Sequence, residues 1–444
     1  MENKTYKYHI ITFGCQMNKS DSERLSFLLE NMGLQKVEKA EDADVIFLNT
    51  CSVRESAEAR IYGQTHNFAK LKLQKPWLII GIIGCMPGRD KDGKIKKRLK
   101  RADLFLPTKD MARLPALLME LNPNLRSMED VEEDYLRLRP NYQRKFQIFV
   151  AIQTGCNQFC AYCVVPYSRG LEKNRPLKDI LAEIKEAAKN GCLEITLVGQ
   201  IVNRYKAPDK ENFSPNNPYK KNDFAKLLWE INQIEGVKRL DWPAPHPLYF
   251  DDELLSALIL PKQVNYVHLP IQSGNNEILA KMNRRHTREF YIDLVEKIRQ
   301  KRPEIAIATD IIVGFCEETE EQFADTVSLY KKCRFDIAYP AKYSTRSGTL
   351  AEKIYKDNVP LSEKKRRWFI LQDLMEQITC EKNKKYLNKT LSVLVDGFKN
   401  DWCEGNSNEM KRVSFKGDES LVGAICEVEI FKTDTWMMWG RCSK

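Results

Sequence analysis

The sequence has no apolar stretch long enough to cross a bilayer. Its longest apolar segment, Trp77–Met86, is about half of the roughly 20 residues that a membrane-spanning helix needs. The first eight residues are polar and lack the apolar core of a secretion signal. Thirteen cysteines in such a chain predict reduced thiols and metal ligation. We therefore expect a soluble cytoplasmic protein without membrane contact.

One cysteine triplet has no fourth ligand nearby. Cys156, Cys160 and Cys163 (the first triplet) have the spacing C-x3-C-x2-C. The next cysteine along the chain is Cys192. A structural zinc site needs four ligands, and a plant-type ferredoxin needs another spacing and a fourth cysteine. Three thiolates can instead hold three corners of an iron–sulfur cube and leave one iron open for chemistry. We predict such a cluster, with a zinc site or inert thiols as alternatives.

Three more cysteines follow three predicted strands. Cys15, Cys51 and Cys85 (the second triplet) each lie within three residues of the end of an apolar run typical of a buried parallel strand. Because the carboxyl ends of parallel strands share one edge of a sheet, we expect these thiols to converge. A second three-thiolate site is therefore predicted, although a single such cysteine is more often a small buried residue. The runs are Tyr8–Phe13, Val45–Leu48 and Leu78–Ile83.

The net charge of +10 does not by itself indicate whether the protein binds nucleic acid. It would suit a polyanionic partner, yet many soluble proteins of this size carry such a charge for solubility. Two basic clusters, Lys96–Arg101 and Lys364–Arg367, could contact nucleic acid or form solvated helix faces.

The rest of the sequence predicts two further structural units. Between Tyr142 and Leu374, strands alternate with amphipathic helices, which indicates a parallel sheet, open or closed into a barrel. The segment 377–444 has short alternating strands and polar turns, which indicate a small β-barrel. The predicted central strands are Phe146–Ile152, Glu194–Val198, Val264–Leu269, Ile305–Val313 and Asp336–Tyr343, with helices at Leu177–Lys189 and Glu318–Lys332. The predicted carboxyl-terminal strands include Leu391–Gly397 and Ala424–Phe431.

Motifs spread over nearly the whole chain carry a resemblance to a known family. In the amino-terminal part they are Phe13–Asn18, Asn49–Glu55 and Gly84–Met86. In the central part they are Gly155–Gly170, Leu197–Gln200, His268–Gly274, Lys281–Arg285, Thr309–Phe315 and Tyr343–Thr349. In this order, they resemble the methylthiotransferase family of radical S-adenosylmethionine (SAM) enzymes.

The resemblance implies an α/β protein of three domains. These are an amino-terminal parallel α/β domain at 5–122, a radical SAM core at 142–374 that forms a partial TIM-like (β/α) barrel, and a TRAM-like antiparallel β-barrel at 377–444. Small barrels of the last kind commonly bind RNA through one face. Its aromatics Phe398, Trp402 and Phe415 could stack bases, with Lys411 and Arg412 on phosphates, or the aromatics could form its core.

The resemblance also implies two [4Fe-4S] clusters, each with three cysteine ligands, and SAM. The cluster of the first triplet would generate a 5′-deoxyadenosyl radical, and that of the second would carry sulfur. A radical is needed because the C2–H bond of adenine is too weakly acidic for a base. The product would carry a methylthio group on C2 of N6-isopentenyl(dimethylallyl)adenosine at position 37 of tRNA, next to the anticodon.

Further residues are predicted to bind the cofactor. Tyr162 resembles the aromatic residue that contacts the SAM adenine. A second group lies near predicted strand ends and could hold the SAM ribose or carboxylate, an ordinary loop hydrogen bond being the alternative. This group is Gln200, Gln272, Ser273, Arg285 and Asp310.

Two arginines and three partners complete these predictions. Arg169 and Arg175 could contact tRNA phosphate or the SAM carboxylate, or be structural. The partners are the tRNA anticodon stem-loop, an electron donor such as flavodoxin or ferredoxin, and a sulfur donor.

The tripeptide Gln16-Met17-Asn18 resembles the family branch that acts on dimethylallyladenosine. Sister branches act on threonylcarbamoyladenosine in tRNA or on a ribosomal protein, and tend toward Lys-Val-Asn or Pro-Lys-Asn at this place. A hypothesis of a different class is a non-catalytic iron–sulfur protein that binds RNA.

Two segments depart from the family pattern. Gly314–Glu320 has Cys316 and Glu317 where the family has Pro-Gly, and this loss should alter the turn. Cys316 is better explained as a turn cysteine than as a ligand. Trp242–Pro245 replaces a Thr/Ser-rich stretch.

Overall fold

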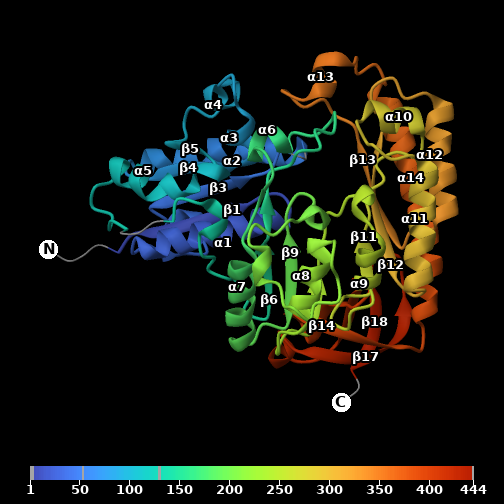
Figure 1. Ribbon diagram of the computed structural model, residues 1–444. Helices are drawn as coiled ribbons and strands as arrows, with labels where there is room; N and C mark the ends of the chain where they lie inside the picture. Colours follow the sequence, from blue (N-terminus) through green and yellow to red (C-terminus); the bar gives the residue numbers. More distant parts are fainter. Residues whose placement is uncertain (1–4, 53–54, 129–131, 443–444) are drawn as a thin grey trace.

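The computed structural model describes residues 5–52, 55–128 and 132–442, which form three bodies (Figure 1). Val53 and Arg54, part of one of the motifs above, lie outside the described residues. Within the described chain, no helix is both long enough and apolar enough to span a membrane.

The amino-terminal body is a five-stranded parallel sheet with the order β2-β1-β3-β4-β5. Its central strands β3 and β4 are buried at every residue, which explains their continuous apolar sequence. The predicted parallel α/β fold is confirmed. The strands are β1 (Lys7–Thr12), β2 (Gln35–Lys36), β3 (Val45–Thr50), β4 (Ile79–Gly84) and β5 (Leu104–Pro107). The helices are α1 (Gln16–Asn31), α2 (Glu55–Gln74), α3 (Cys85–Arg89), α4 (Lys94–Arg98) and α5 (Leu114–Leu121).

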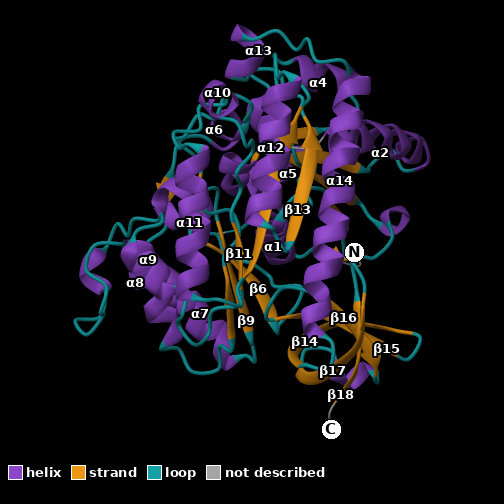
Figure 2. Ribbon diagram, turned by 90° about the vertical axis from the view of Figure 1, so that its right-hand side faces the viewer, coloured by secondary structure: helices purple, strands orange, loops and turns teal. Residues whose placement is uncertain are grey.

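The central body consists of two three-stranded parallel sheets, β10-β9-β6 and β11-β12-β13. A parallel bridge between Leu240 of β10 and Gln263 joins them. Helices α11, α12 and α14 cover the outer face of the second sheet (Figure 2). The arrangement is the predicted partial TIM-like barrel. The strands are β6 (Gln147–Ala151), β9 (Glu194–Val198), β10 (Arg239–Asp241), β11 (Tyr266–His268), β12 (Ala306–Val313) and β13 (Ile337–Lys342).

Helices follow the strands of this body in turn. They are α6 (Val165–Arg169), α7 (Leu177–Lys189), α8 (Asp223–Asn232), α9 (Asp252–Ala257), α10 (Asn276–Lys281), α11 (Arg288–Lys301), α12 (Glu320–Cys333), α13 (Leu350–Ile354) and α14 (Leu361–Asn383). A short antiparallel pair, β7 (Gln153–Thr154) and β8 (Lys173–Asn174), closes the base of the loop that carries the first triplet.

The carboxyl-terminal body is a closed barrel with the order β14-β15-β16-β18-β17. The pair β16–β18 is parallel, which departs from the wholly antiparallel pattern predicted. The reason is that β17 returns to pair with β14, so β18 must close the barrel beside β16 in the same direction. The strands are β14 (Thr390–Lys399), β15 (Trp402–Ser407), β16 (Arg412–Lys416), β17 (Ile425–Thr433) and β18 (Met438–Cys442).

The segments that depart from the family pattern have structural roles. Glu317 has φ 63°, so the turn keeps a left-handed residue without a glycine. Its carboxylate pairs with Lys281 at 2.8 Å. Cys316 is 1% exposed and packs in a small core with Phe315. Trp242 is also buried, in the main core.

The amino-terminal and central bodies meet at α3 and α6. Gly88 of α3 lies so close to α6 that an added Cβ would be 2.0 Å from the carbonyl oxygen of Ser168. Helix α3 begins at Cys85, and α6 begins at Val165, directly beyond the first triplet. This contact therefore places the segment that begins at Cys85 next to the loop that carries the first triplet.

We predict that Gly88→Ala destabilises the protein, because the new methyl group forces two backbone segments apart. The loss should be about 1–3 kcal/mol of unfolding free energy. Gly63→Ala is the matched control, since an added Cβ at Gly63 in α2 has nothing within 4 Å. Alanine there should raise stability by about 0.5–1 kcal/mol. Thermal unfolding compares the two, and equal stability of Gly88→Ala and the wild type would contradict the close contact.

Candidate active site

The loop of the first triplet is held tightly at its base. The amide of Cys156 donates to the carbonyl of Gly170 at 3.1 Å. Gly155 has φ 75°, and an added Cβ there would lie 2.0 Å from the carbonyl oxygen of Leu171. Glycine is needed at this position for both reasons. The turn that places Cys156 is thus set by backbone contacts.

The other end of this loop contacts the segment after α10. The amide of Ala161 donates to Met282 at 2.9 Å. The side-chain amide of Asn283 donates to the carbonyls of Gln158 and Phe159 at 3.1 and 3.0 Å. The loop is therefore braced from both sides before any metal binds.

A buried guanidinium lies beside the first triplet. Arg284 Nη1 is 3.9 Å from Cys160 Sγ, and its Nη2 donates to the carbonyl of Pro270 at 2.9 Å. Burial raises the pKa of the Cys156 thiol to about 11, and burial followed by the charge of Cys160 raises the pKa of Cys163. The positive charge of Arg284 opposes the rise in the pKa of Cys163 and so favours the thiolate form that binds metal.

The second triplet lies on three adjacent strands of the amino-terminal sheet. Cys15 follows β1, Cys51 follows β3 and Cys85 follows β4, and these strands are neighbours. A Cβ added to Gly14 would be 2.7 Å from Cys51 Cβ, so the first two of these loops touch. Asn18 joins them, because its Nδ2 donates to the carbonyl of Thr50 at 3.2 Å while its Oδ1 is 3.4 Å from Cys15 Sγ.

The donor set of each triplet is three thiols, the set that can hold three corners of an iron–sulfur cube. Among the described residues, no three Cys, His, Asp or Glu side chains surround one point where a metal ion could sit. A cube needs a different arrangement, since each thiolate binds a different iron. Each triplet would supply three sulfur ligands to such a cube, and the fourth iron would then be open to a small ligand.

Two adjoining cavities connect the triplets. One, of about 600 Å³, is lined by Tyr162 and Cys163, and the other, of about 670 Å³, is lined by Cys15. They share Asp310, Tyr339 and Trp436. A further cavity of about 690 Å³, between α7 and residues 137–145, is lined by no cysteine.

Three of the predicted cofactor residues line the 600 Å³ cavity: Tyr162, Gln272 and Asp310. Gln272 has φ 74°, a strained value for a residue other than glycine, and strain of this kind often accompanies functional sites. The backbone amide of Gln272 donates to the backbone carbonyl of Asp310 at 2.9 Å. Asp310 Oδ2 lies 3.1 Å from His268 Nε2, a partner that the sequence did not single out.

The other three lie elsewhere. Gln200 follows β9, and its Oε1 is buried without a hydrogen-bond partner among the described residues, so it is available to a ligand. Ser273 is fully buried against Thr326 of α12. Arg285 is exposed, whereas the adjacent Arg284 contacts the first triplet. Arg284 and Arg285 are adjacent and of the same type, so no pattern in the sequence indicates which of them contacts the first triplet.

The two arginines left open by the sequence make buried ion pairs. Arg169 Nη2 lies 2.5 Å from Asp21 Oδ2, with both side chains buried. Arg175 Nη1 lies 2.6 Å from Glu183 Oε2. The structural alternative therefore applies to both. The first pair also joins the loop of the first triplet to α1, which begins directly after Cys15.

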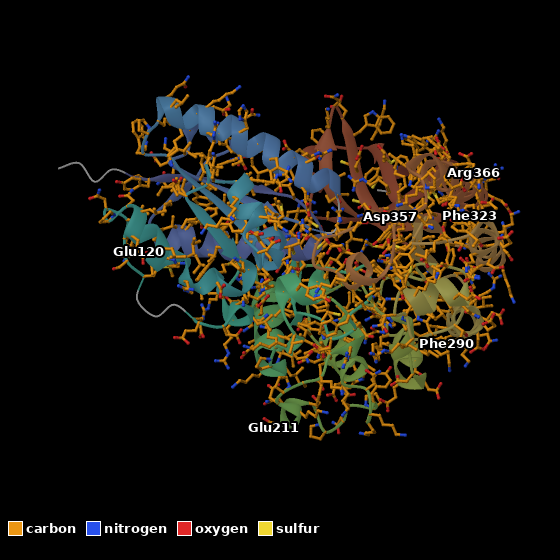
Figure 3. All side chains as sticks on the ribbon, turned by 90° about the horizontal axis from the view of Figure 1, so that it is seen from above. Glu120, Glu211, Phe290, Phe323, Asp357 and Arg366 are labelled. Atoms are coloured by element: carbon orange, nitrogen blue, oxygen red, sulfur yellow. The ribbon has the colours of Figure 1, made fainter. Side chains whose placement is uncertain are left out.

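Several predicted RNA contacts have internal partners instead. Phe415 is fully buried in the barrel core and cannot stack on a base. Arg412 pairs with Asp396 at 2.7 Å. In the basic cluster 364–367, Arg366 pairs with Glu320 and Glu363, and it lies at the outer edge of the molecule (Figure 3).

Two family models match parts of the chain. Residues 7–107 match Uncharacterized protein family UPF0004, and residues 150–330 match the radical SAM superfamily. A solved radical SAM methyltransferase, TsrM from Kitasatospora setae, superposes with a TM-score of 0.54 at 13% identity, covering 76% of this chain and 73% of that one. The cobalamin-dependent SAM radical enzyme OxsB superposes with a TM-score of 0.51 at 12% identity, covering 92% and 64%. The superfamily match and the shared fold define a radical SAM enzyme, a class that uses SAM and an iron–sulfur cluster.

Curated relatives define the family within that class. A tRNA-2-methylthio-N(6)-dimethylallyladenosine synthase of Thermoanaerobacter sp. is 41% identical, over 99% of this chain and 93% of the relative. Enzymes of the same name from Shouchella clausii and Thermotoga petrophila are 42% and 38% identical, each over 98% of this chain and over 83% and 96% of the relative. The chain belongs to the family of these methylthiotransferases.

We predict that Asp21→Asn strongly destabilises the protein, because Arg169 then keeps its charge in a buried site without a carboxylate. Removing one member of a buried pair typically costs about 3–5 kcal/mol. Replacing both partners, as in Asp21→Leu with Arg169→Met, should recover part of the loss.

The control for this prediction is Asp293→Asn. Its pair with Lys297 is 2.8 Å long, but the two side chains are more than half exposed. The expected change is below about 0.5 kcal/mol. Unfolding free energies measure all variants, and an Asp21→Asn loss as small as the control's would contradict the prediction.

Proposed function

We propose that the protein adds a methylthio group to C2 of N6-dimethylallyladenosine at position 37 of tRNA. The observation that carries this proposal is the identity of about 41% to enzymes of that name over nearly the whole chain. The Gln16-Met17-Asn18 tripeptide supports the same branch. One cysteine of each triplet lines one of two adjoining cavities, Cys163 in one and Cys15 in the other, which supports a reaction that uses both triplets.

The six cysteines are proposed as ligands of two [4Fe-4S] clusters, three for each. When bound, the cluster of the first triplet and SAM would supply radical chemistry for an aromatic C–H bond that a base cannot deprotonate, and the other cluster would supply sulfur. The proposed domains are 5–122, 142–374 and 377–444. An electron donor such as flavodoxin or ferredoxin and a separate sulfur donor are the proposed partners.

The residues around the cavities would bind, orient and shield the reactants. Tyr162 offers an aromatic surface beside Cys163, and Gln272 and Asp310 offer polar groups on the same wall. The imidazole of His268 lies beside the carboxylate of Asp310, with Nε2 3.1 Å from Oδ2. Apolar wall residues such as Ile311 exclude water, which protects a reactive carbon centre.

The test is mass spectrometry of tRNA nucleosides from cells with and without this protein. Loss of 2-methylthio-N6-isopentenyladenosine, with the unthiolated nucleoside accumulating, is expected. If the threonylcarbamoyl nucleoside loses its methylthio group instead, the sister branch is correct. No change in either would leave the ribosomal-protein branch or a non-catalytic RNA-binding protein, and would refute the proposal.

We predict that variants of the two triplets differ in a defined way. Cys163→Ala should abolish both reductive SAM cleavage and product, because the open iron that binds SAM is lost. Cys51→Ala should abolish the methylthio product but leave SAM cleavage. Each should lower the iron content by about four per chain.

Cys380→Ala, in the partly buried position on α14, is the control for these variants. It should retain the iron content and both activities of the wild type. Iron analysis and quantification of 5′-deoxyadenosine check the set. SAM cleavage by Cys163→Ala at the wild-type rate would contradict the assignment of the first triplet.

A further inference from the structure

An exposed tryptophan lies where the two cavities adjoin. Trp436 is 54% exposed and lines both of them. It belongs to the carboxyl-terminal barrel, in the turn between β17 and β18. Since the cavities also hold Cys163 and Cys15, the barrel contributes an aromatic surface to the space that connects the two triplets.

The turn that carries Trp436 is fixed to α14. Asn383 Nδ2 donates to the carbonyls of Asp434 and Thr435 at 2.7 and 3.3 Å. The Thr435 hydroxyl donates to the carbonyl of Glu376 at 3.4 Å. The turn is therefore ordered before a ligand arrives, so ordering its backbone adds no cost to binding.

Helix α14 runs antiparallel to β13, and the two lie side by side (Figure 2). Near the start of the helix, Lys364 Nζ donates to the carbonyl of Tyr343 at 3.2 Å. Near its end, the Thr379 hydroxyl donates to the carbonyl of Asp336 at 3.1 Å. Tyr343 packs in one small core with Ala161 of the first-triplet loop. The first triplet thus lies near the start of α14, and Trp436 near its end.

The exposure of the indole separates it from the place of reaction. A reactive carbon centre needs a site that excludes water, whereas Trp436 is 54% exposed. A base stacked on the exposed face of Trp436 is therefore better placed to be a neighbour of the reacting base than the reacting base itself.

We propose that Trp436 is a stacking surface for an unpaired RNA base that neighbours the reacting adenosine in the anticodon loop. The inference rests on the proposed function for the identity of the RNA. Single-stranded loops offer unstacked bases, and every base has a face that can stack on an aromatic ring. Trp436 would thereby position the loop, while the polar residues near the first triplet contact the target.

The test is binding and kinetics with an anticodon stem-loop RNA that carries N6-dimethylallyladenosine. For Trp436→Ala we expect the Kd and KM to rise about 5- to 150-fold, the range for loss of one base–aromatic stack, with a smaller change in kcat. Trp436→Phe should restore most of the affinity. Phe431→Ala is the matched control, because Phe431 is 47% exposed on the same barrel but lines neither cavity.

A spectroscopic readout identifies the stacked base. With 2-aminopurine at each loop position in turn, one position other than the target should be quenched on binding to the wild type and recover in Trp436→Ala. A Kd for Trp436→Ala within twofold of that for Phe431→Ala would overturn the inference, as would a response confined to the target position. A wild type that makes no methylthio product, combined with weaker RNA binding by Trp436→Ala, would refute the proposed reaction and support the stacking site.

Discussion

Direct backbone contact between α3 and α6, together with the buried pair of Asp21 and Arg169, holds the two halves of the site together. The close approach at Gly88 leaves no room for a side chain. The ion pair lies directly beyond it, between α1 and the end of α6. Because each triplet sits on its own parallel sheet, neither sheet alone contains the site. The chemistry depends on the fixed orientation of one sheet edge toward the other.

Much of this arrangement could be predicted from the sequence, because its signals are local. The apolar runs predicted β1, β3 and β4, and the position of Cys15, Cys51 and Cys85 after them placed all three on one edge. Residues whose role depends on packing could not be predicted in this way. The local backbone conformation decides that Arg284, and not Arg285, contacts the first triplet. Trp436 lines the cavities because the barrel packs against α14.

The charged residues show why composition gave a weak prediction of RNA binding. Arg366 is neutralised by Glu320 and Glu363, and Arg412 by Asp396. Lys411 is buried and donates to the carbonyl of Asp336, and burial lowers the pKa of Lys411 to about 8. These cations stabilise internal contacts and contribute little field at the surface. The net charge includes buried and paired cations, whereas a nucleic acid would interact only with cations that are exposed and unpaired.

The length of α14 has a consequence for how enzymes of this architecture can diverge. A helix transmits both distance and direction, so inserting one residue between Lys364 and Glu376 would move the barrel turn by about 1.5 Å and rotate it by about 100°. A tolerated change would need a whole turn or a compensating kink. This helix therefore acts as a fixed spacer, and its residue count is constrained even where its side chains are not.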